Sequence, residues 1–212
     1  ISLQLTVTGK TALKGGMEEP WKMTRLKWLN STLGQDNTVI APYTALKESN
    51  RSITLLGRKL ILDNHGLPSN IQTFFTPEMT ELSSVPNNIL AAPIKFVIET
   101  ETGTEELKPI SFSYISKTAG TIRWTAVSAS QGIKLEVTGS LEFDGFVAYQ
   151  VKLSATENIK VKDISMILPF NKEAGVYMMG LGQKGGYRPS SYYWKWDVAN
   201  KNQDGAWIGN VN

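Results

Sequence analysis

Gly180, Gly182 and Gly185 have the spacing of a glycine-rich loop that holds the pyrophosphate of a dinucleotide. Such a loop must follow a strand and open a helix, because the helix N-terminus supplies the N–H groups that bind the phosphates. Here Pro189 and a run of aromatic residues follow, and they do not open such a helix. The sequence therefore argues against nucleotide binding, and we expect the glycines to make positive-φ turns at a sheet edge.

Aromatic and polar side chains are dense in residues 184–207. Aromatic faces stack on the C–H faces of sugar rings, while forked donors and carboxylates bond the hydroxyl groups. The pattern indicates a carbohydrate-binding surface. Its candidate residues are Lys184, Tyr187, Arg188, Trp194, Trp196 and Asp197. The two tryptophans at 194 and 196 lie two positions apart, on one face of a strand, so a core role and a ligand platform both stay open for them.

Groups suited to catalysis are few. The single histidine, His65, lies in the turn sequence DNHGLP and is expected to be a solvent-exposed turn residue. Carboxylate pairs for glycoside cleavage exist among Glu142, Asp144, Asp197 and Asp204, but the sequence does not determine their separation. We therefore assign no catalytic residue, no metal ligand and no cofactor.

Composition narrows the class of protein. The chain has no cysteine, which excludes disulfides, thiolate zinc sites and a cysteine nucleophile. Its 22 basic and 19 acidic residues are interspersed, whereas a nucleic-acid-binding surface needs a basic stripe. No apolar run approaches the roughly 18 residues that a membrane span requires. The sequence predicts no nucleic-acid partner and no membrane span.

Alternation of apolar and polar residues, the pattern of half-buried strands, dominates the chain. It occurs at residues 3–7, 94–98, 110–114, 122–126 and 133–143, among others. Turn residues separate these runs at short intervals, and no 12-residue window has a helical period. We predict an all-β fold, a large antiparallel β-sandwich with little helix.

Local signals add detail to this expectation. Asp144-Gly145 predicts a tight hairpin turn, and Gly139 predicts a kink or bulge within a strand. A shift of the alternation near Lys162 and Asp163 predicts another bulge. No Pro/Gly/Ser-rich linker divides the chain, so we expect a single domain over residues 1–212, with 1–20 as a loosely attached leading segment.

Two long stretches carry a family resemblance. They include RLKWLNSTLGQD with ITLLGRKLILDNHGLPSNIQTFF, and LEFDGFVAYQVKLSATENIKVKDISMILPF with YMMGLGQKGGYRPSSYYWKWD. The chain resembles glycoside hydrolase family 123-like proteins, large bacterial proteins frequent in Bacteroidetes, over most of residues 21–212. The resemblance implies a β-rich domain that precedes a TIM-barrel-like catalytic domain. It also implies a fragment of a longer, exported protein of the periplasm or the cell surface.

A shorter likeness concerns the tyrosine, the Gly-Leu-Gly and the Trp-rich segment after them. It is similar to the N-terminal domain of α-glucosidase-type enzymes and implies a galactose mutarotase-like supersandwich, whose glycine loop reaches toward the catalytic barrel. Sugar mutarotases use two histidines and a glutamate. Because His65 is the one histidine here, mutarotase catalysis is not expected.

The resulting functional hypothesis is an accessory, non-catalytic domain of a glycoside hydrolase. Its partner would be a carbohydrate bound by residues 180–207, or an adjacent catalytic domain of the same protein whose site it shapes. Two alternatives stay open. One is a stand-alone glycosidase or epimerase that uses acidic residues, and the other is a purely structural interaction module.

Overall fold

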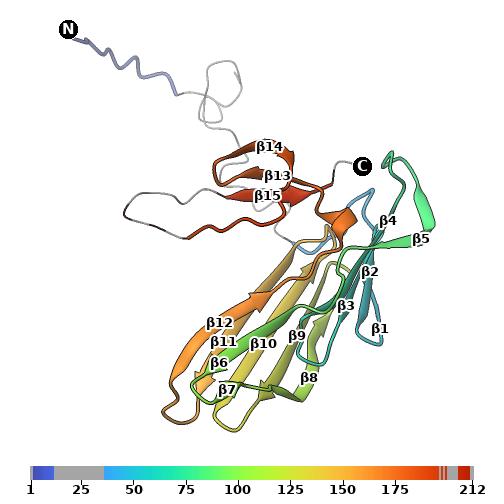
Figure 1. Ribbon diagram of the computed structural model, residues 1–212. Coiled ribbons are helices and arrows are strands. Elements are labelled where there is room, and N and C mark those ends of the chain that lie inside the picture. Colours follow the sequence, from blue (N-terminus) through green and yellow to red (C-terminus); the bar gives the residue numbers. More distant parts are fainter. Residues whose placement is uncertain (1, 12–35, 196, 198, 200–204, 211–212) are drawn as a thin grey trace. The chain divides into compact units, whose positions relative to one another are not determined.

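The structure, a computed structural model, describes residues 2–11, 36–195, 197, 199 and 205–210 (Figure 1). The chain divides into two units, Ile1–Thr38 and Val39–Asn212. In the first unit the alternation of Leu3, Leu5 and Val7 predicts a strand, but residues 2–11 form none. A strand needs a neighbour to bond to, and the described residues of this unit contain no second strand. These three side chains are accordingly 86–94% exposed.

The second unit is built from antiparallel sheets, which confirms the predicted all-β class with little helix. The strands of the five-stranded sheet, in spatial order, are β1 (Lys47–Ser49), β2 (Ser52–Leu55), β3 (Arg58–Leu62), β4 (Pro68–Phe75) and β5 (Leu82–Asn88). The four-stranded sheet has the order β11 (Val147–Ala155), β10 (Ile133–Glu142), β9 (Thr121–Ala129) and β8 (Lys108–Lys117).

Two smaller sheets complete this unit. The first has the order β12 (Val161–Ile167), β6 (Lys95–Thr100) and β7 (Gly103–Thr104). The second has the order β14 (Gln183–Tyr187), β13 (Tyr177–Gly180) and β15 (Ala206–Gly209). Among the described residues the one helical element is a short 3₁₀ helix, Lys172–Ala174. The likeness to the galactose mutarotase supersandwich stays a prediction.

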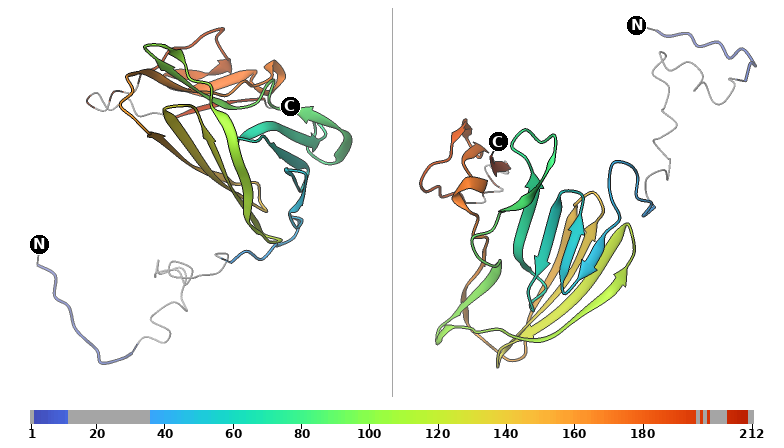
Figure 2. Two further views of the ribbon diagram at one scale, coloured as in Figure 1. Left: turned by 90° about the horizontal axis from the view of Figure 1, so that it is seen from below. Right: turned by 90° about the vertical axis from the view of Figure 1, so that its right-hand side faces the viewer.

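The two larger sheets pack face to face. Buried and less buried residues alternate along β9 and β10, so one face of the four-stranded sheet is apolar and the other polar. The main core joins this face to the five-stranded sheet. Its members are Leu46, Ile53, Leu55, Leu60, Leu62, Ile122, Trp124 and Leu141. The right-hand view of Figure 2 shows the two sheets stacked, as the predicted sandwich requires.

Trp124 on β9 lies at the centre of this core and is fully buried. Its indole N–H donates to the carbonyl of Gly66 at 2.9 Å, and its ring meets Tyr149 edge-on at 5.8 Å. Gly139, opposite it on β10, would place a Cβ 2.3 Å from the indole ring. A bulge at Gly139 is excluded, because the strand register runs through this residue without a shift, and the kink stays a prediction. Because glycine has no Cβ, this position leaves room for the indole ring of Trp124.

The other two local predictions are confirmed. Glu142 N donates to Phe146 O at 2.9 Å across the hairpin turn, where Gly145 has φ +97°. The pairing of β12 with β6 shifts register between Val161 and Asp163. These signals were readable because both are local: a turn needs a residue that tolerates positive φ, and a bulge shifts the apolar pattern by one.

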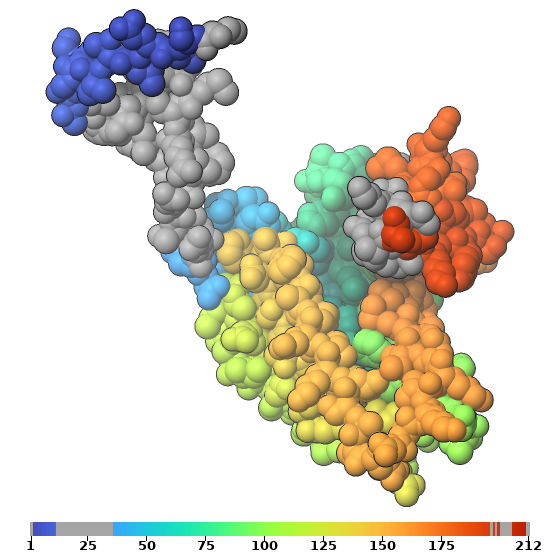
Figure 3. Space-filling model, turned by 90° about the vertical axis from the view of Figure 1, so that its left-hand side faces the viewer, coloured from blue at the N-terminus to red at the C-terminus, as the bar shows by residue number. Residues whose placement is uncertain are grey.

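β11 and β12 are edge strands of their sheets, and both contribute to the surface in Figure 3. Ile164 and Met166 of β12 pair with Ile98 and Phe96 and so share their face of the sheet. Ile98 is fully buried, yet Ile164 and Met166 are each 50% exposed. The described residues therefore leave the β12 edge of the sandwich only partly covered.

Candidate functional site

The glycine-rich segment forms a β-hairpin. Gly180 at the end of β13 pairs with Gln183 at the start of β14, and Leu181 and Gly182 make the two-residue turn between them. Their φ angles, +51° and +83°, are both positive, as in the type I′ turns that suit the twist of a hairpin. The expected positive φ occurs at all four glycines of the segment, Gly180, Gly182, Gly185 and Gly186. In the described chain the motif is followed by strand, so no helix N-terminus faces it.

Apolar side chains gather on one face of the β14-β13-β15 sheet. Tyr177 is in register with Tyr187, and Met179 is in register with Trp207. Because alternate residues of a strand share a face, these four side chains lie on the same side of the sheet. The two tyrosine rings stack at 5.1 Å with an interplanar angle of 28°. Tyr187 is 81% exposed, Met179 55% and Trp207 44%.

Tyr177, Met179 and Trp207 border a groove of about 450 Å³, which we call the β13–β15 groove. Its lining residues are Tyr177, Met178, Met179, Gly185, Gly186 and Trp207. Two glycines shape it. A Cβ on Gly209 would lie 2.6 Å from the Trp207 ring, so its absence lets the indole lie against the strand. Gly185 presents bare backbone beside Met179. The groove can therefore receive one flat face of a ring against aromatic and thioether surfaces.

Tyr187 stacks on Tyr177 and raises the pKa of the Tyr177 hydroxyl above its ordinary value, first through hydrogen bonding to that hydroxyl and then through electrostatic repulsion. The Tyr177 hydroxyl is consequently neutral at neutral pH.

A second concave site surrounds His65, in the turn between β3 and β4. The carboxylate of Asp63 accepts hydrogen bonds from the backbone N–H of His65 at 2.8 Å and of Leu67 at 3.0 Å. Gly66 takes a φ of +78° and presents its carbonyl to Trp124. The turn is thereby fixed from both sides. The expectation of an exposed turn histidine differs from the structure, which has His65 half-buried.

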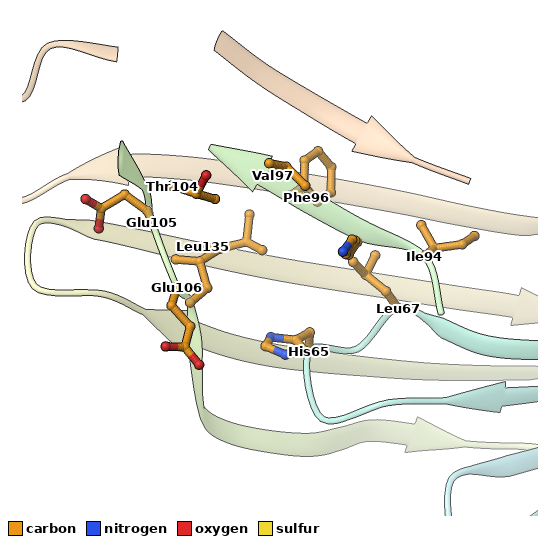
Figure 4. Close-up of a pocket in the computed structure, with 11 residues that line it drawn as sticks. His65, Leu67, Ile94, Phe96, Val97, Thr104, Glu105, Glu106 and Leu135 are labelled. Carbon is orange, nitrogen blue, oxygen red and sulfur yellow. The ribbon is translucent and has the colours of Figure 1, made fainter. Parts of the chain in front are cut away.

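The imidazole of His65 is also fixed. Its Nδ1 shares a hydrogen bond of 2.8 Å with the hydroxyl of Ser128, a residue that is 1% exposed. His65 also borders a cavity of about 400 Å³, which we call the His65 cleft. Figure 4 shows the cleft with His65, Phe96 and Leu135 around it and the carboxylates of Glu105 and Glu106 toward one end.

The family model described as glycoside hydrolase 123, third domain, matches residues 46–212. The chain belongs to the glycoside hydrolase 123 family. The match covers the whole β-sandwich together with the β13–β15 groove and the His65 cleft. No curated protein and no solved structure matches the chain.

The sequence-predicted site residues of the glycoside hydrolase 123 domain differ in where they lie relative to the groove. Tyr187 stacks on Tyr177 at the wall of the groove, whereas Lys184 is an exposed residue of β14 that does not line the groove. Arg188 donates through Nε to the carbonyl of Gly175, so part of its guanidinium holds backbone. Trp194 and Asp197 are half-buried and do not line the groove. Trp196 and residues 202–204 lie outside the described residues. The roles of all six candidates as ligand contacts stay a prediction.

Tyr177, Met179 and Trp207 were missing from the sequence-based set. Tyr177 and Met179 share a face of β13, but the partner strand that carries Trp207 begins 26 residues beyond the end of β13. Only the register of the sheet brings them together.

Two further observations apply to the part of the chain that the structure describes. No helical segment there has the length and apolar character needed to cross a membrane. No three side chains of His, Cys, Asp or Glu come together there as a metal site would require.

Asp63 gives the domain a predicted pH dependence. Burial raises the pKa of Asp63 above its ordinary 3.8, although its hydrogen bonds and His65 oppose this shift. The folded state therefore binds the proton more tightly than the unfolded state. The contribution of Asp63 to stability is full below about pH 4 and declines as pH rises through the raised pKa. The change is about 1 kcal/mol or less, because solvent screens the half-buried side chain.

Asp63→Asn tests this dependence, since the amide does not titrate but its oxygen can still accept both backbone hydrogen bonds. Urea unfolding between pH 4 and 7 should show that the wild type loses stability relative to Asp63→Asn as pH rises. Asp144→Asn controls for the loss of one charge. A wild-type curve that gained stability relative to Asp63→Asn over this range would contradict the assignment.

Proposed function

We propose that this domain is a non-catalytic, carbohydrate-associated module of a glycoside hydrolase 123 protein, and that the β13–β15 groove binds a sugar ring of its glycan. One observation carries the proposal. Met179, Trp207 and Tyr187, which stacks on the half-buried Tyr177, are exposed together on one sheet face beside a groove of about 450 Å³. A soluble domain rarely leaves aromatic side chains gathered in this way without a partner.

The chemistry of the groove suits a pyranose better than a charged ligand. Its lining side chains are aromatic or thioether, and the remaining surface is glycine backbone that can offer N–H and C=O groups to hydroxyls. Stacking on aromatic faces contributes about 0.5–1.5 kcal/mol per ring contact. Because the groove is shallow and few rings take part, we expect dissociation constants in the range of about 0.1–10 mM.

A non-catalytic role is supported by what lines the groove. Glycoside cleavage in most enzymes needs two carboxyl groups, about 5–9.5 Å apart, beside the sugar. The described lining of the groove contains tyrosine, methionine, glycine and tryptophan and no carboxylate. The groove would thus hold the glycan for chemistry performed elsewhere in the parent protein, which we propose to be exported to the periplasm or the cell surface.

Calorimetric titration of the full chain with neutral, acidic and amino-sugar oligosaccharides tests this function. We expect at least one neutral oligosaccharide to bind with a millimolar or lower dissociation constant, and longer chains to bind no worse than short ones. If no oligosaccharide binds at about 10 mM, the groove is not a carbohydrate site, and its apolar face is better explained as a contact with a neighbouring domain.

A further inference from the structure

The core-side face of the five-stranded sheet ends in a row of polar residues. Ile71 of β4 packs against the main core. Thr73, two positions further along β4, lies on the same face of the strand. The strand register places Arg58 of β3 on one side of Thr73 and Asn87 of β5 on the other. Three neighbouring strands therefore each contribute a polar side chain where the apolar core stops.

Two of these three side chains have hydrogen-bonding groups to spare. The guanidinium of Arg58 donates to the carbonyl of Asp144 at 2.8 Å and is thus used within the protein. Neither the hydroxyl of Thr73 nor the amide of Asn87 makes a hydrogen bond to any residue that the structure describes. Both residues line a concave site of about 420 Å³, which we call the Asn87 pocket.

Hydrogen bonds fix the segments that surround the Asn87 pocket. Its lining comes from β4, β5, the turn after β4, the 3₁₀ helix and the residue that follows β15. The amide of Asn171, just before the 3₁₀ helix, donates to the carbonyl of Asn88 at 2.7 Å. The amide of Asn210 donates to the carbonyl of Glu173 at 2.9 Å. The helix is thereby held to β5 and to the end of β15, on two sides of the pocket.

The apolar part of the lining includes Phe75, Pro77 and Met79. Gly57 fixes the ring of Phe75, because a Cβ on this glycine would lie 2.3 Å from the ring. Met79 is 67% exposed and adds a thioether surface. Aromatic and thioether surfaces can receive the C–H face of a ligand ring.

The polar part of the lining favours a ligand with hydroxyl groups. A threonine hydroxyl and an asparagine amide can each both donate and accept hydrogen bonds, as a ligand hydroxyl can. An ammonium group only donates and a carboxylate only accepts, so either leaves part of the lining unmatched. Glu173 is the one charged side chain of the lining, and it is exposed, so its attraction for a cation is small.

We infer that the Asn87 pocket binds a neutral sugar ring and is a second carbohydrate site of this domain. Hydroxyl groups of the sugar bond to Thr73 and Asn87, while a C–H face lies against Phe75 and Met79. The pocket shares no lining residue with the β13–β15 groove. The inference rests on the proposed function for the class of ligand but not for the site.

NMR titration of the full chain with methyl β-glucoside, methyl β-galactoside and cyclohexylmethanol tests the inference. Cyclohexylmethanol has a six-membered ring and one hydroxyl but no hydroxyls on the ring, so it measures the apolar contribution alone. We expect at least one glycoside to bind with a dissociation constant of about 1–20 mM, at least about threefold more tightly than cyclohexylmethanol. The side-chain amide signals of Asn87 should shift with the glycoside.

The double variant Thr73→Val/Asn87→Leu removes both polar groups but keeps side chains of similar size. It should abolish the preference for the glycoside over cyclohexylmethanol. If the double variant does not fold, Asn87→Leu alone decides, because Asn87 is exposed and its replacement leaves the core intact. Asn158→Leu is the matched control, since this exposed asparagine lies between β11 and β12 and does not line the pocket.

Three results would overturn the inference. Cyclohexylmethanol binds as tightly as both glycosides, the folded double variant keeps the full glycoside preference, or neither glycoside shifts the Asn87 signals at about 50 mM. Trp207→Ala separates the two carbohydrate sites, because it should leave the Asn87 shifts in place. Sugar shifts confined to the β13–β15 groove would overturn this inference and leave the proposed function standing. Shifts confined to the Asn87 pocket would support this inference and contradict the assignment of the groove.

Discussion

Trp124→Ala is expected to lower the free energy of unfolding by about 3–5 kcal/mol, the range for removing a large buried aromatic side chain. Trp124 is fully buried between the two sheets of the sandwich. Its removal leaves a cavity against Tyr149 and Gly139, and it leaves the carbonyl of Gly66 without its donor. Since stability of a domain totals about 5–15 kcal/mol, this one change removes much of it.

Urea unfolding followed by circular dichroism measures the effect. Trp124→Phe keeps most of the ring but not the N–H donor and should be intermediate. Trp207→Ala serves as the matched control, because Trp207 is 44% exposed and its loss should cost less than about 1 kcal/mol. A loss below about 1 kcal/mol for Trp124→Ala would show that the two sheets are not joined through this residue.

Trp207→Ala and Tyr187→Ala are expected to weaken glycan binding at least about tenfold each, with the stability of the fold retained. Trp207→Ala removes an aromatic side chain that lines the β13–β15 groove, and Tyr187→Ala removes the ring that stacks on Tyr177 of the lining. A tenfold loss corresponds to about 1.4 kcal/mol, close to the value of one aromatic contact. Both variants are measured by calorimetry with the oligosaccharide that binds the wild type.

Tyr193→Ala provides the control for this pair. Tyr193 is 86% exposed and does not line the groove, so its removal changes the number of surface tyrosines without changing the groove. Equal losses in Tyr193→Ala and Tyr187→Ala would mean that binding is not specific to the groove. Gly185→Ala offers a second check of the groove, since a side chain at this lining residue would strain a backbone with φ +94°.

The sequence predicted the fold well where the cause is local. Alternation of apolar and polar residues along 121–142 predicted β9 and β10, and Asp144-Gly145 predicted the turn that follows β10. Gly139 shows the limit of that reasoning. A glycine within a strand indicates either a bulge or the close approach of another group, and only the position of Trp124 decides between them.

The functional residues were harder to predict for the same reason. His65 was expected in an exposed turn, because nothing nearby in the chain shows that Ser128, 63 residues away, meets its ring. The apolar groups at 177, 179 and 207 become a groove only through the register of three short strands. Composition indicated a segment rich in aromatic residues, and tertiary structure selects which of its side chains line the groove.

The most direct test of the carbohydrate proposal is the indole N–H signal of Trp207 in a two-dimensional NMR spectrum during titration with the oligosaccharide that binds most tightly. The chain has six tryptophans, and the spectrum of Trp207→Phe identifies the signal. Sugar binding in the β13–β15 groove predicts a saturable shift of the Trp207 signal, with the buried Trp124 signal unchanged. Sugar binding that leaves the Trp207 signal in place would contradict the assignment of the groove.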